Sequence, residues 1–139
     1  MRWDFRTAPG EPAPVVTREA FLSACEAFLA QGLERGDWIY WIAVHEGQII
    51  SHIFVHLFRP VPKPFQLVSR YGYMTNVYTK LPYRNQGIGS ELMRHVKQWA
   101  QKENVPFIIV SPSETSVPFY QRAGFTFETE FMELYLDGH

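Results

Sequence analysis

A glycine-rich string between a strand-like run and a helix limits the folds open to this chain. Residues 84–89 read Arg-Asn-Gln-Gly-Ile-Gly, the β-rich run before them covers 71–79, and a strongly amphipathic helix begins near Ser90. Glycine adopts the backbone conformations of a tight corner and leaves room for a ligand at the backbone. The first N–H groups of a helix lack intrahelical partners and carry partial positive charge. The string therefore predicts a strand-to-helix corner that holds a phosphate or diphosphate, with Arg84 adding a cation.

Hydrophobic periodicity places this corner within a series of helices and strands. Thr17 is a good N-cap for an early helix that Gly32 or Gly36 can end, and Glu46-Gly47 marks the turn of a hairpin. The predicted elements are, in order, a helix over 18–34, strands over 38–44, 48–58 and 71–79, a helix from Ser90 that ends before Asn104, a short strand over 107–110, a short helix from Ser116 through Arg122, and a last strand over 125–136. This order predicts an α/β sandwich in which helices flank a mixed central β-sheet.

Proline restricts two further segments. Three prolines in residues 1–16 forbid regular helix, so we expect an irregular N-terminal arm there, with a short edge strand at Trp3 to Arg6. Three more prolines lie in residues 59–70, which are predicted to form a loop between two strands.

Length and composition predict one domain, covering residues 1–139, with a core of its own. The hydrophobic fraction of 46% excludes a disordered chain, and a formal net charge of -1 gives no electrostatic reason to bind nucleic acid. Cys25 is the lone cysteine, and the first residues lack the apolar run of a signal peptide, so we expect a cytoplasmic protein. The longest apolar runs fall far short of the roughly 20 residues that span a bilayer, so no membrane partner is expected.

Three segments together resemble a known family. Tyr-Arg-Asn-Gln-Gly-Ile-Gly-Ser-Glu-Leu-Met at 83–93 follows the strand at 73–79 and precedes Val-Pro-Phe-Tyr-Gln-Arg-Ala-Gly-Phe at 117–125. In order and spacing they resemble the GCN5-related N-acetyltransferase (GNAT) family, clearly from about Trp38 to Leu136 and poorly before that. The resemblance implies a GNAT-like mixed sheet with a shortened N-terminal region. It also implies acetyl-CoA as cosubstrate and transfer of the acetyl group to a primary amine of a small molecule or peptide.

The same resemblance implies which residues contact acetyl-CoA. The diphosphate would bind Arg84 and the backbone of the glycine corner, and the pantetheine arm would pair with a strand that diverges from its neighbour. A backbone N–H of that strand would polarise the acetyl carbonyl. This chain departs from the family at the turn, where the common proline is replaced by Leu81 and Pro82 follows it. The implied binding residues are Val77, Tyr78, Thr79, Arg84, Asn85, Gln86, Gly87, Ile88, Gly89, Ser90 and, where many relatives have an asparagine, Ser113.

Tyr120 lies where the resemblance places the tyrosine that donates a proton to the departing CoA thiolate. A phenol with an ordinary pKa of about 10 is protonated at neutral pH and can serve as that acid. The alternative interpretation is an aromatic residue that packs beside Phe119 and Phe125. Tyr120 is therefore the candidate catalytic residue.

No residue is marked as the base for the acceptor amine, and water can carry the proton to bulk solvent instead. His52 and His56 share one strand face, and such a pair is more typical of partly buried sheet histidines than of a base or a metal site. Cys25 lies on the apolar face of the early helix without a Cys-His context, so we interpret it as a core residue and expect direct transfer. Metal-ligand spacing is absent from the sequence, and no metal is expected.

Three questions stay open at the level of sequence. One alternative function is a non-catalytic acyl-CoA-binding or regulatory module of the same fold. A nucleotide-binding domain is disfavoured because the sequence lacks Gly-x-Gly-x-x-Gly after a first strand and Gly-Lys-Ser/Thr at the loop.

The short N-terminal region indicates either a trimmed fold or one that a second chain completes in a homodimer. The acceptor is unknown, although the family usually builds its acceptor pocket from the early helix and the loop at 59–70.

Overall fold

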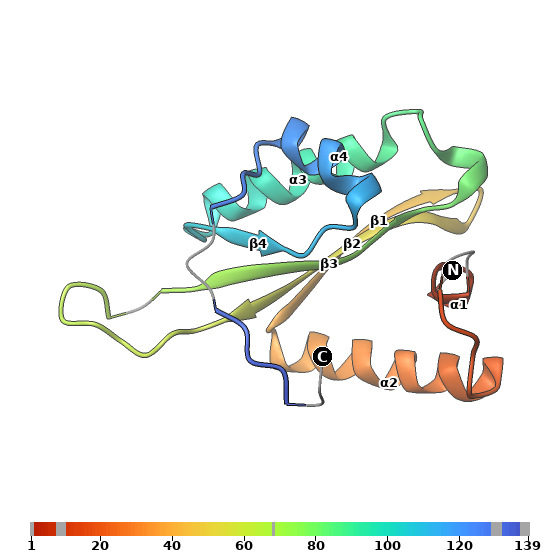
Figure 1. Ribbon diagram of the computed structural model, residues 1–139, viewed down its shortest axis with the longest axis horizontal. Coiled ribbons are helices and arrows are strands. Elements are labelled where there is room, and N and C mark those ends of the chain that lie inside the picture. The colour runs from red at the N-terminus through yellow and green to blue at the C-terminus, as the bar shows by residue number, and fades with distance from the viewer. Residues whose placement is uncertain (1, 8–10, 68, 129–131, 137–139) are drawn as a thin grey trace.

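A four-stranded β-sheet forms the centre of the computed structural model, which describes residues 2–7, 11–67, 69–128 and 132–136 (Figure 1). The strands lie side by side in chain order: β1 (Trp38–His45), β2 (Gln48–Phe58), β3 (Tyr71–Thr79) and β4 (Ile108–Val110). β2 is antiparallel to both of its neighbours, β1 and β3, and β4 runs parallel to β3. The predicted hairpin, the strand over 71–79 and the mixed character of the sheet are confirmed.

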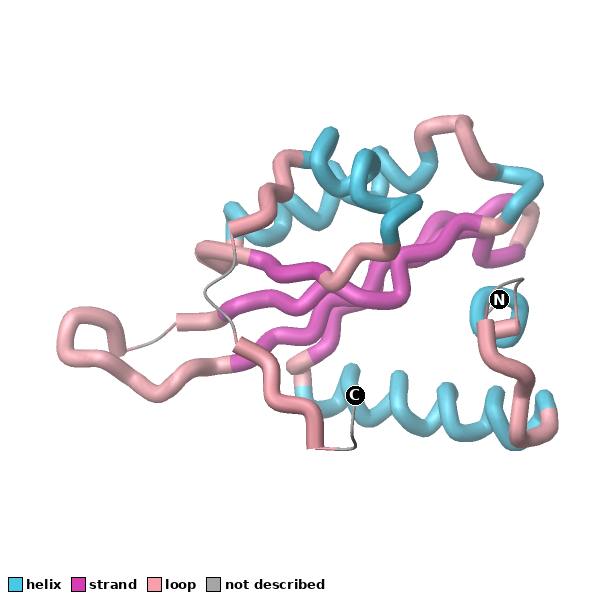
Figure 2. The backbone as a smooth tube through the Cα atoms, in the orientation of Figure 1, coloured by secondary structure: helices cyan, strands magenta, loops and turns pink. Residues whose placement is uncertain are grey.

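Helices cover both faces of this sheet. One face is covered by α3 (Ile88–Lys102) and α4 (Val117–Ala123), and the other by α1 (Arg2–Arg6) and α2 (Arg18–Arg35) (Figures 1 and 2). Two short 3₁₀ turns, Leu81–Tyr83 and Glu114–Ser116, precede α3 and α4. This arrangement confirms the predicted α/β sandwich and places the glycine corner between β3 and α3.

The main core lies between the sheet and α3. Apolar residues of α3 recur every three or four positions, which places them on one stripe facing the strands. Ile53, Val55 and Met74 of the sheet are at most 1% exposed. The buried residues of this cluster are Ile53, Val55, Met74, Leu92, Met93, Val96 and Tyr120.

Local signals fix the ends of α2. The hydroxyl of Thr17 accepts a hydrogen bond from the N–H of Ala20 at 3.1 Å, and Gly36 ends the helix in the left-handed conformation with φ of 71°. The predicted helix over 18–34 is therefore confirmed, with Gly36 as its stop. Cys25 on this helix is half-buried and is not among the buried core residues, so its interpretation as a core residue is wrong.

The predicted edge strand at Trp3 to Arg6 is wrong, because these residues belong to the helix α1. The prolines of the arm all come after this segment and therefore do not prevent a helix within it. Aromatic packing holds α1 in place: the ring of Trp3 meets Phe21 edge-on at 5.7 Å, and that of Phe5 stacks on Tyr78 at 4.7 Å. The sequence pattern alone does not reveal these tertiary contacts.

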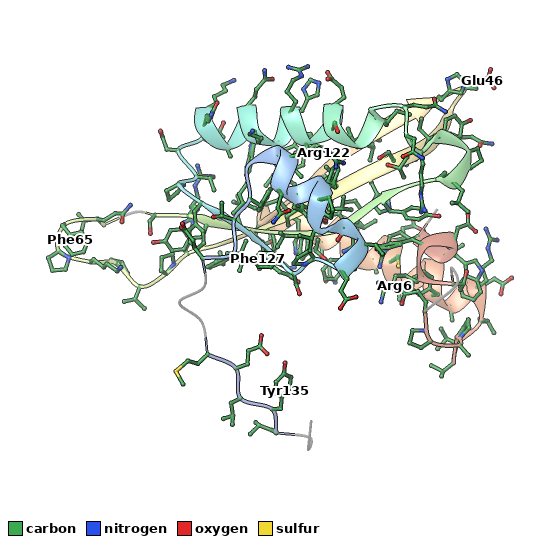
Figure 3. The ribbon with its side chains drawn as sticks, turned by 45° about the horizontal axis from the view of Figure 1, so that its top comes forward. Arg6, Glu46, Phe65, Arg122, Phe127 and Tyr135 are labelled. Atoms are coloured by element: carbon green, nitrogen blue, oxygen red, sulfur yellow. The ribbon has the colours of Figure 1, made fainter. Side chains whose placement is uncertain are left out.

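The predicted last strand over 125–136 is also wrong for the residues that the structure describes, 125–128 and 132–136, none of which is in a strand. Alternating apolar residues give a strand a buried face, but a strand also needs a neighbour to hydrogen-bond with. The N–H of Phe125 instead donates to the carbonyl of Tyr120 in the turn that ends α4. Phe127 is 69% exposed, and Tyr135 lies away from the sheet (Figure 3).

The loop at 59–70 projects from the end of the sheet where β2 passes into β3 (Figure 1). Phe65 near its tip is 83% exposed. No helix in the described part of the chain is long and apolar enough to cross a membrane.

Candidate functional site

The pairing between β3 and β4, at one edge of the sheet, stops partway along β3. The parallel ladder pairs Gly72 with Ile108 and ends at Met74 and Val110, whereas β3 continues to Thr79. Among the described residues, no strand pairs with the outer edge of β3 beyond this point. The predicted pantetheine-binding residues Val77, Tyr78 and Thr79 all lie on this part of β3.

Hydrogen bonds show which backbone groups face that free edge. The carbonyls of Asn76 and Tyr78 accept hydrogen bonds from His52 and Ser51 of β2, so both point toward β2. The N–H of Val77 belongs to the same planar trans peptide as the Asn76 carbonyl, and beyond the bulge the N–H of Lys80 donates to Ile50 of β2, so from Val77 to Lys80 the backbone groups alternate between the two sides. The N–H and C=O of Val77 therefore point to the free outer edge. The carbonyl of Thr79 follows the same pattern, since it accepts a hydrogen bond from a residue outside the sheet.

The glycine corner has the backbone that its sequence predicts. Gly87 is the N-cap of α3, with φ of 79° and open space where a Cβ would stand, and Asn85 is also left-handed, with φ of 60°. The helix begins at Ile88, two residues earlier than expected. No side chain caps this helix, so the N–H groups of residues 88–90 are available to a ligand. Gln86 stiffens the corner by donating to the carbonyl of Pro82 at 3.1 Å.

Arg84 connects the end of β3 with the glycine corner. Its Nε donates to the carbonyl of Thr79 at 2.7 Å, and its guanidinium lies over the ring of Tyr78 at 5.2 Å. These two contacts hold an exposed cation beside the free edge of β3.

Gly89 lies where three motif-bearing segments meet. A Cβ on Gly89 would stand 3.5 Å from the ring of Phe119 on α4 and 3.7 Å from the hydroxyl of Thr79 on β3. The first turn of α3 therefore contacts both the end of β3 and α4. Ser90, in the same turn, lines an open groove of about 320 Å³ between α3 and α4, to which Phe119 and Arg122 also contribute.

Tyr120 is buried in the wall beside this corner, with 7% of its surface exposed. Its ring meets Phe119 and Phe125 edge-on, as the packing interpretation predicts. Burial, followed by the neighbouring phenol of Tyr73, raises the pKa of Tyr120. The hydroxyl therefore keeps its proton at neutral pH, so the packing and acid interpretations are compatible.

Ser113 makes its described hydrogen bonds within its own turn. Its hydroxyl donates to Ser116 Oγ at 2.9 Å and lies 3.3 Å from Thr115 Oγ1. None of the described hydrogen bonds of Ser113 joins it to β3 or to the glycine corner, so it is the most weakly placed of the candidate residues.

The sequence analysis expected His52 and His56 to be partly buried sheet histidines, and it did not identify His52 as a neighbour of the candidate site. The two histidines of β2 have different surroundings: His56 is half-buried, 3.4 Å from a carboxylate oxygen of Asp37, whereas His52 is 3% exposed. Nδ1 of His52 donates to the backbone carbonyl of Asn76. Burial, only partly offset by this bond, lowers the pKa of His52 to about 4, so the ring is neutral at pH 7. The sequence held one signal of an irregularity at this point of β3: Asn76 lies within a strand-like run, although asparagine is depleted in strands.

Comparisons with known proteins agree with this geometry. The family model described as Acetyltransferase (GNAT) family matches residues 2–125. A predicted acetyltransferase with acetyl-CoA from Clostridium acetobutylicum has a similar structure, with a TM-score of 0.75 and 26% identity over 92% of this chain and 81% of that chain. A search of curated proteins finds no match.

Two more distant structures share the fold. A GCN5-related N-acetyltransferase from Ralstonia eutropha JMP134 gives a TM-score of 0.71 at 23% identity, over 94% of this chain and 84% of that chain. Glucosamine-6-phosphate N-acetyltransferase from Arabidopsis thaliana gives 0.66 at 19% identity, over 91% and 84% respectively.

Proposed function

Because the chain belongs to the acetyltransferase (GNAT) family, we propose that it transfers the acetyl group of acetyl-CoA directly to a primary amine of a small molecule or peptide. The observation that carries this proposal is the free outer edge of β3 at Val77, beside the uncapped N-terminus of α3. An extended arm can hydrogen-bond to a free strand edge, and a diphosphate suits a helix N-terminus. One continuous segment, 77–90, therefore offers partners to both parts of acetyl-CoA.

The glycine corner suits a diphosphate for two reasons. Its backbone N–H groups at residues 88–90 have no side-chain cap competing for them, and the left-handed Gly87 carries no side chain in the open space above it. Arg84 adds a fixed positive charge nearby, held by Thr79. In contrast, α2 has an N-terminus that Thr17 already caps, so the two helices differ in what they offer an anion.

Val77 supplies the donor that acyl transfer requires. Acetyl-CoA brings an activated thioester, and the chain must stabilise the negative charge that grows on its carbonyl oxygen. A fixed backbone N–H directed at that oxygen does this at no reorganisation cost, and losing such a donor elsewhere costs about 2.7 to 4 kcal/mol. In this assignment Val77 N–H is the donor, because it points to the free edge of β3.

Tyr120 supplies the proton for the departing thiolate. Its raised pKa keeps the phenol protonated until negative charge develops on sulfur. Cys25 is an unsuitable intermediate acyl carrier, because it lies on α2, which packs against β1, two strands away from β3 in the sheet. Both substrates are therefore bound before the acetyl group moves.

The acceptor approaches from the face of the sheet that α1 and α2 cover. On that face Tyr73, Thr75 and Tyr78 of β3 remain partly exposed, whereas α3 and α4 pack on the opposite face. The loop at 59–70 lies at the other end of β3 from the glycine corner, so α1 and α2 are the nearer elements (Figure 1).

Mass spectrometry of a panel of primary amines incubated with the protein and acetyl-CoA tests this function. The panel includes arylalkylamines, polyamines, peptide N-termini and glucosamine 6-phosphate, the last because of the Arabidopsis structure. We expect at least one amine to gain an acetyl group at a rate that depends on protein concentration. Tight acetyl-CoA binding without any acetylated amine would instead identify the non-catalytic module.

A further inference from the structure

We propose that His52 is a positioning residue for acyl transfer: its imidazole fixes the Asn76–Val77 peptide so that Val77 N–H faces the thioester carbonyl. The proposal rests on the function assigned above and adds a residue of β2, whose side chain lies on the face opposite α3. Three features of the structure support it: a β-bulge in β3, the peptide plane shared by Asn76 and Val77, and the buried imidazole of His52.

The β-bulge lies where β3 leaves β4. His52 pairs with Tyr78, and Phe54 pairs with Thr75, so two residues of β3, Asn76 and Val77, oppose the single residue between them on β2. Asn76 has φ of 54°, the left-handed region that L-residues rarely adopt. A bulge redirects backbone groups, and without further contacts its orientation would be weakly determined. The contacts on Asn76 therefore determine how Val77 presents its N–H.

The peptide bond carries the orientation from His52 to Val77. The carbonyl of Asn76 and the N–H of Val77 belong to one planar trans peptide, so they point in opposite directions. Because His52 Nδ1 donates to this carbonyl from the β2 side, the N–H on the same plane is turned toward the free outer edge. A hydrogen bond to the carbonyl also polarises the peptide and makes its N–H a stronger donor.

A second contact holds the bulge residue by its side chain. A guanidinium nitrogen of Arg2 donates to Oδ1 of Asn76, and Asn76 Nδ2 donates to Thr75 Oγ1 at 3.3 Å. Arg2 belongs to α1, the helix whose Phe5 meets the ring of His52 edge-on at 6.1 Å. The N-terminal helix therefore covers His52 and anchors Asn76 from the same side.

The buried imidazole explains why His52 positions the peptide and does not carry protons. A carbonyl accepts only, so Nδ1 carries the hydrogen, and Nε2 is left with its lone pair. Nε2 is buried and has no hydrogen-bond partner among the described residues. The rings of Phe54, at 4.7 Å, and Phe5 pack around it. A substrate amine does not reach a nitrogen enclosed in this way, so the contact with Asn76 is the one through which His52 acts.

Two amide substitutions separate the nitrogens of the ring. In His52→Asn the side-chain N–H₂ stands near the place of Nδ1 and can still donate to Asn76, whereas in His52→Gln the amide stands near the place of Nε2. His56→Gln is the matched control, because His56 lies on the same face of β2 and does not contact Asn76. Melting curves establish that all three variants fold.

The informative readout is the infrared stretch of the carbonyl in bound [1-¹³C]acetyl-CoA, which reports how strongly the protein polarises it. We expect a shift to lower frequency on binding in the wild type, His52→Asn and His56→Gln, and a smaller shift in His52→Gln. We also expect kcat of His52→Gln to fall roughly 10- to 100-fold, as for small misplacements of catalytic groups, with Kd for acetyl-CoA within threefold of wild type.

Two results would overturn the proposed role of His52 while leaving the proposed function intact. In the first, a His52→Gln variant that binds acetyl-CoA keeps the wild-type carbonyl frequency and kcat. In the second, His52→Asn and His52→Gln lose the frequency shift and kcat to the same extent, although only the Asn side chain can still donate to the Asn76 carbonyl. A wild-type protein that does not bind acetyl-CoA would overturn the proposed function and this inference together, so the two failures are distinguishable.

Discussion

Met74 of β3 and Val110 of β4 form the last pair of the parallel ladder, and from there β3 runs on without β4. The end of this ladder leaves the rest of the outer edge of β3 unpaired among the described residues, and we propose that acetyl-CoA binds there. Where strands are paired, their backbone groups are already used, whereas the free edge of β3 at Val77 lies in the segment that leads directly into α3 at Ile88.

Gly87→Val should weaken CoA binding by introducing both strain and a side chain at the phosphate corner. Gly87 has φ of 79°, and an L-residue there costs about 1 to 2 kcal/mol of stability. Gly36→Val is a matched control, since Gly36 has φ of 71°, equally open space around it, and a place at the end of α2. Calorimetry should show weaker CoA binding for Gly87→Val alone, with similar stability losses in both. Equal CoA affinities would mean that the phosphate lies elsewhere.

Arg84→Ala should weaken acetyl-CoA binding by roughly 1.5 to 3 kcal/mol, the range for hydrogen bonds to charged groups. The fold should remain intact, because Arg84 is exposed and its partner Thr79 is also held by Ser51 at 2.8 Å. Arg35→Ala, at the far end of α2, removes an exposed arginine without touching the corner. Titration calorimetry that gives all three proteins the same affinity would remove Arg84 from the site.

Tyr120→Phe should lower kcat by about 10²- to 10⁴-fold while leaving acetyl-CoA affinity nearly unchanged. Phenylalanine keeps the ring that packs on Phe119 and Phe125 and loses only the proton that the thiolate needs. Initial rates from pH 6 to 9, on an amine whose chemistry is rate-limiting, provide the measurement. A Phe variant as fast as wild type throughout would leave Tyr120 with packing alone.

The stability of the protein should fall as the pH drops from 7 to 5, and His52 should account for much of the loss. Its folded pKa of about 4 lies below the ordinary value of 6.5, so the unfolded chain binds more protons in this window. The part of the unfolding free energy that depends on a neutral His52 is therefore fully present above pH 6.5 and is lost toward pH 4, by about 2 kcal/mol between pH 7 and pH 5. Urea unfolding at both pH values should show a clearly smaller decrease for His52→Asn, which does not titrate. An unchanged decrease would place the pH sensitivity in other groups.

Local patterns predicted the segment that forms the candidate site. The β-rich run at 71–79 and the left-handed Gly87 depend on residues close in sequence, which is why strand and corner fall where expected. The long helix α3 follows from its apolar stripe for the same reason. Long-range contacts decided the rest. Helix α1 forms where Phe5 meets Tyr78, and the burial of His52 depends on that helix and on the bulge at Asn76.

The C-terminal prediction was wrong for a related reason. Residues 125–128 alternate in a way that suits a strand, yet the alternation says only which face would be buried and names no neighbour. Gly124 turns the chain at the end of α4 with φ of 107°, and the N–H of Phe125 is used in that turn. Pairing partners cannot be inferred from alternation alone.

A crystal structure of the complex with acetyl-CoA tests the central assignment most directly. We predict the diphosphate within hydrogen-bond distance of the N–H groups of residues 88–90, the pantetheine along the outer edge of β3, and the thioester carbonyl facing Val77 N–H. A second groove offers the contradicting outcome: it lies between β1 and α3, is lined by Trp41, Ile42 and Leu92, and also reaches Gly87. Acetyl-CoA bound in that groove, with the edge of β3 left unpaired, would show that the separation of β3 and β4 does not form the site.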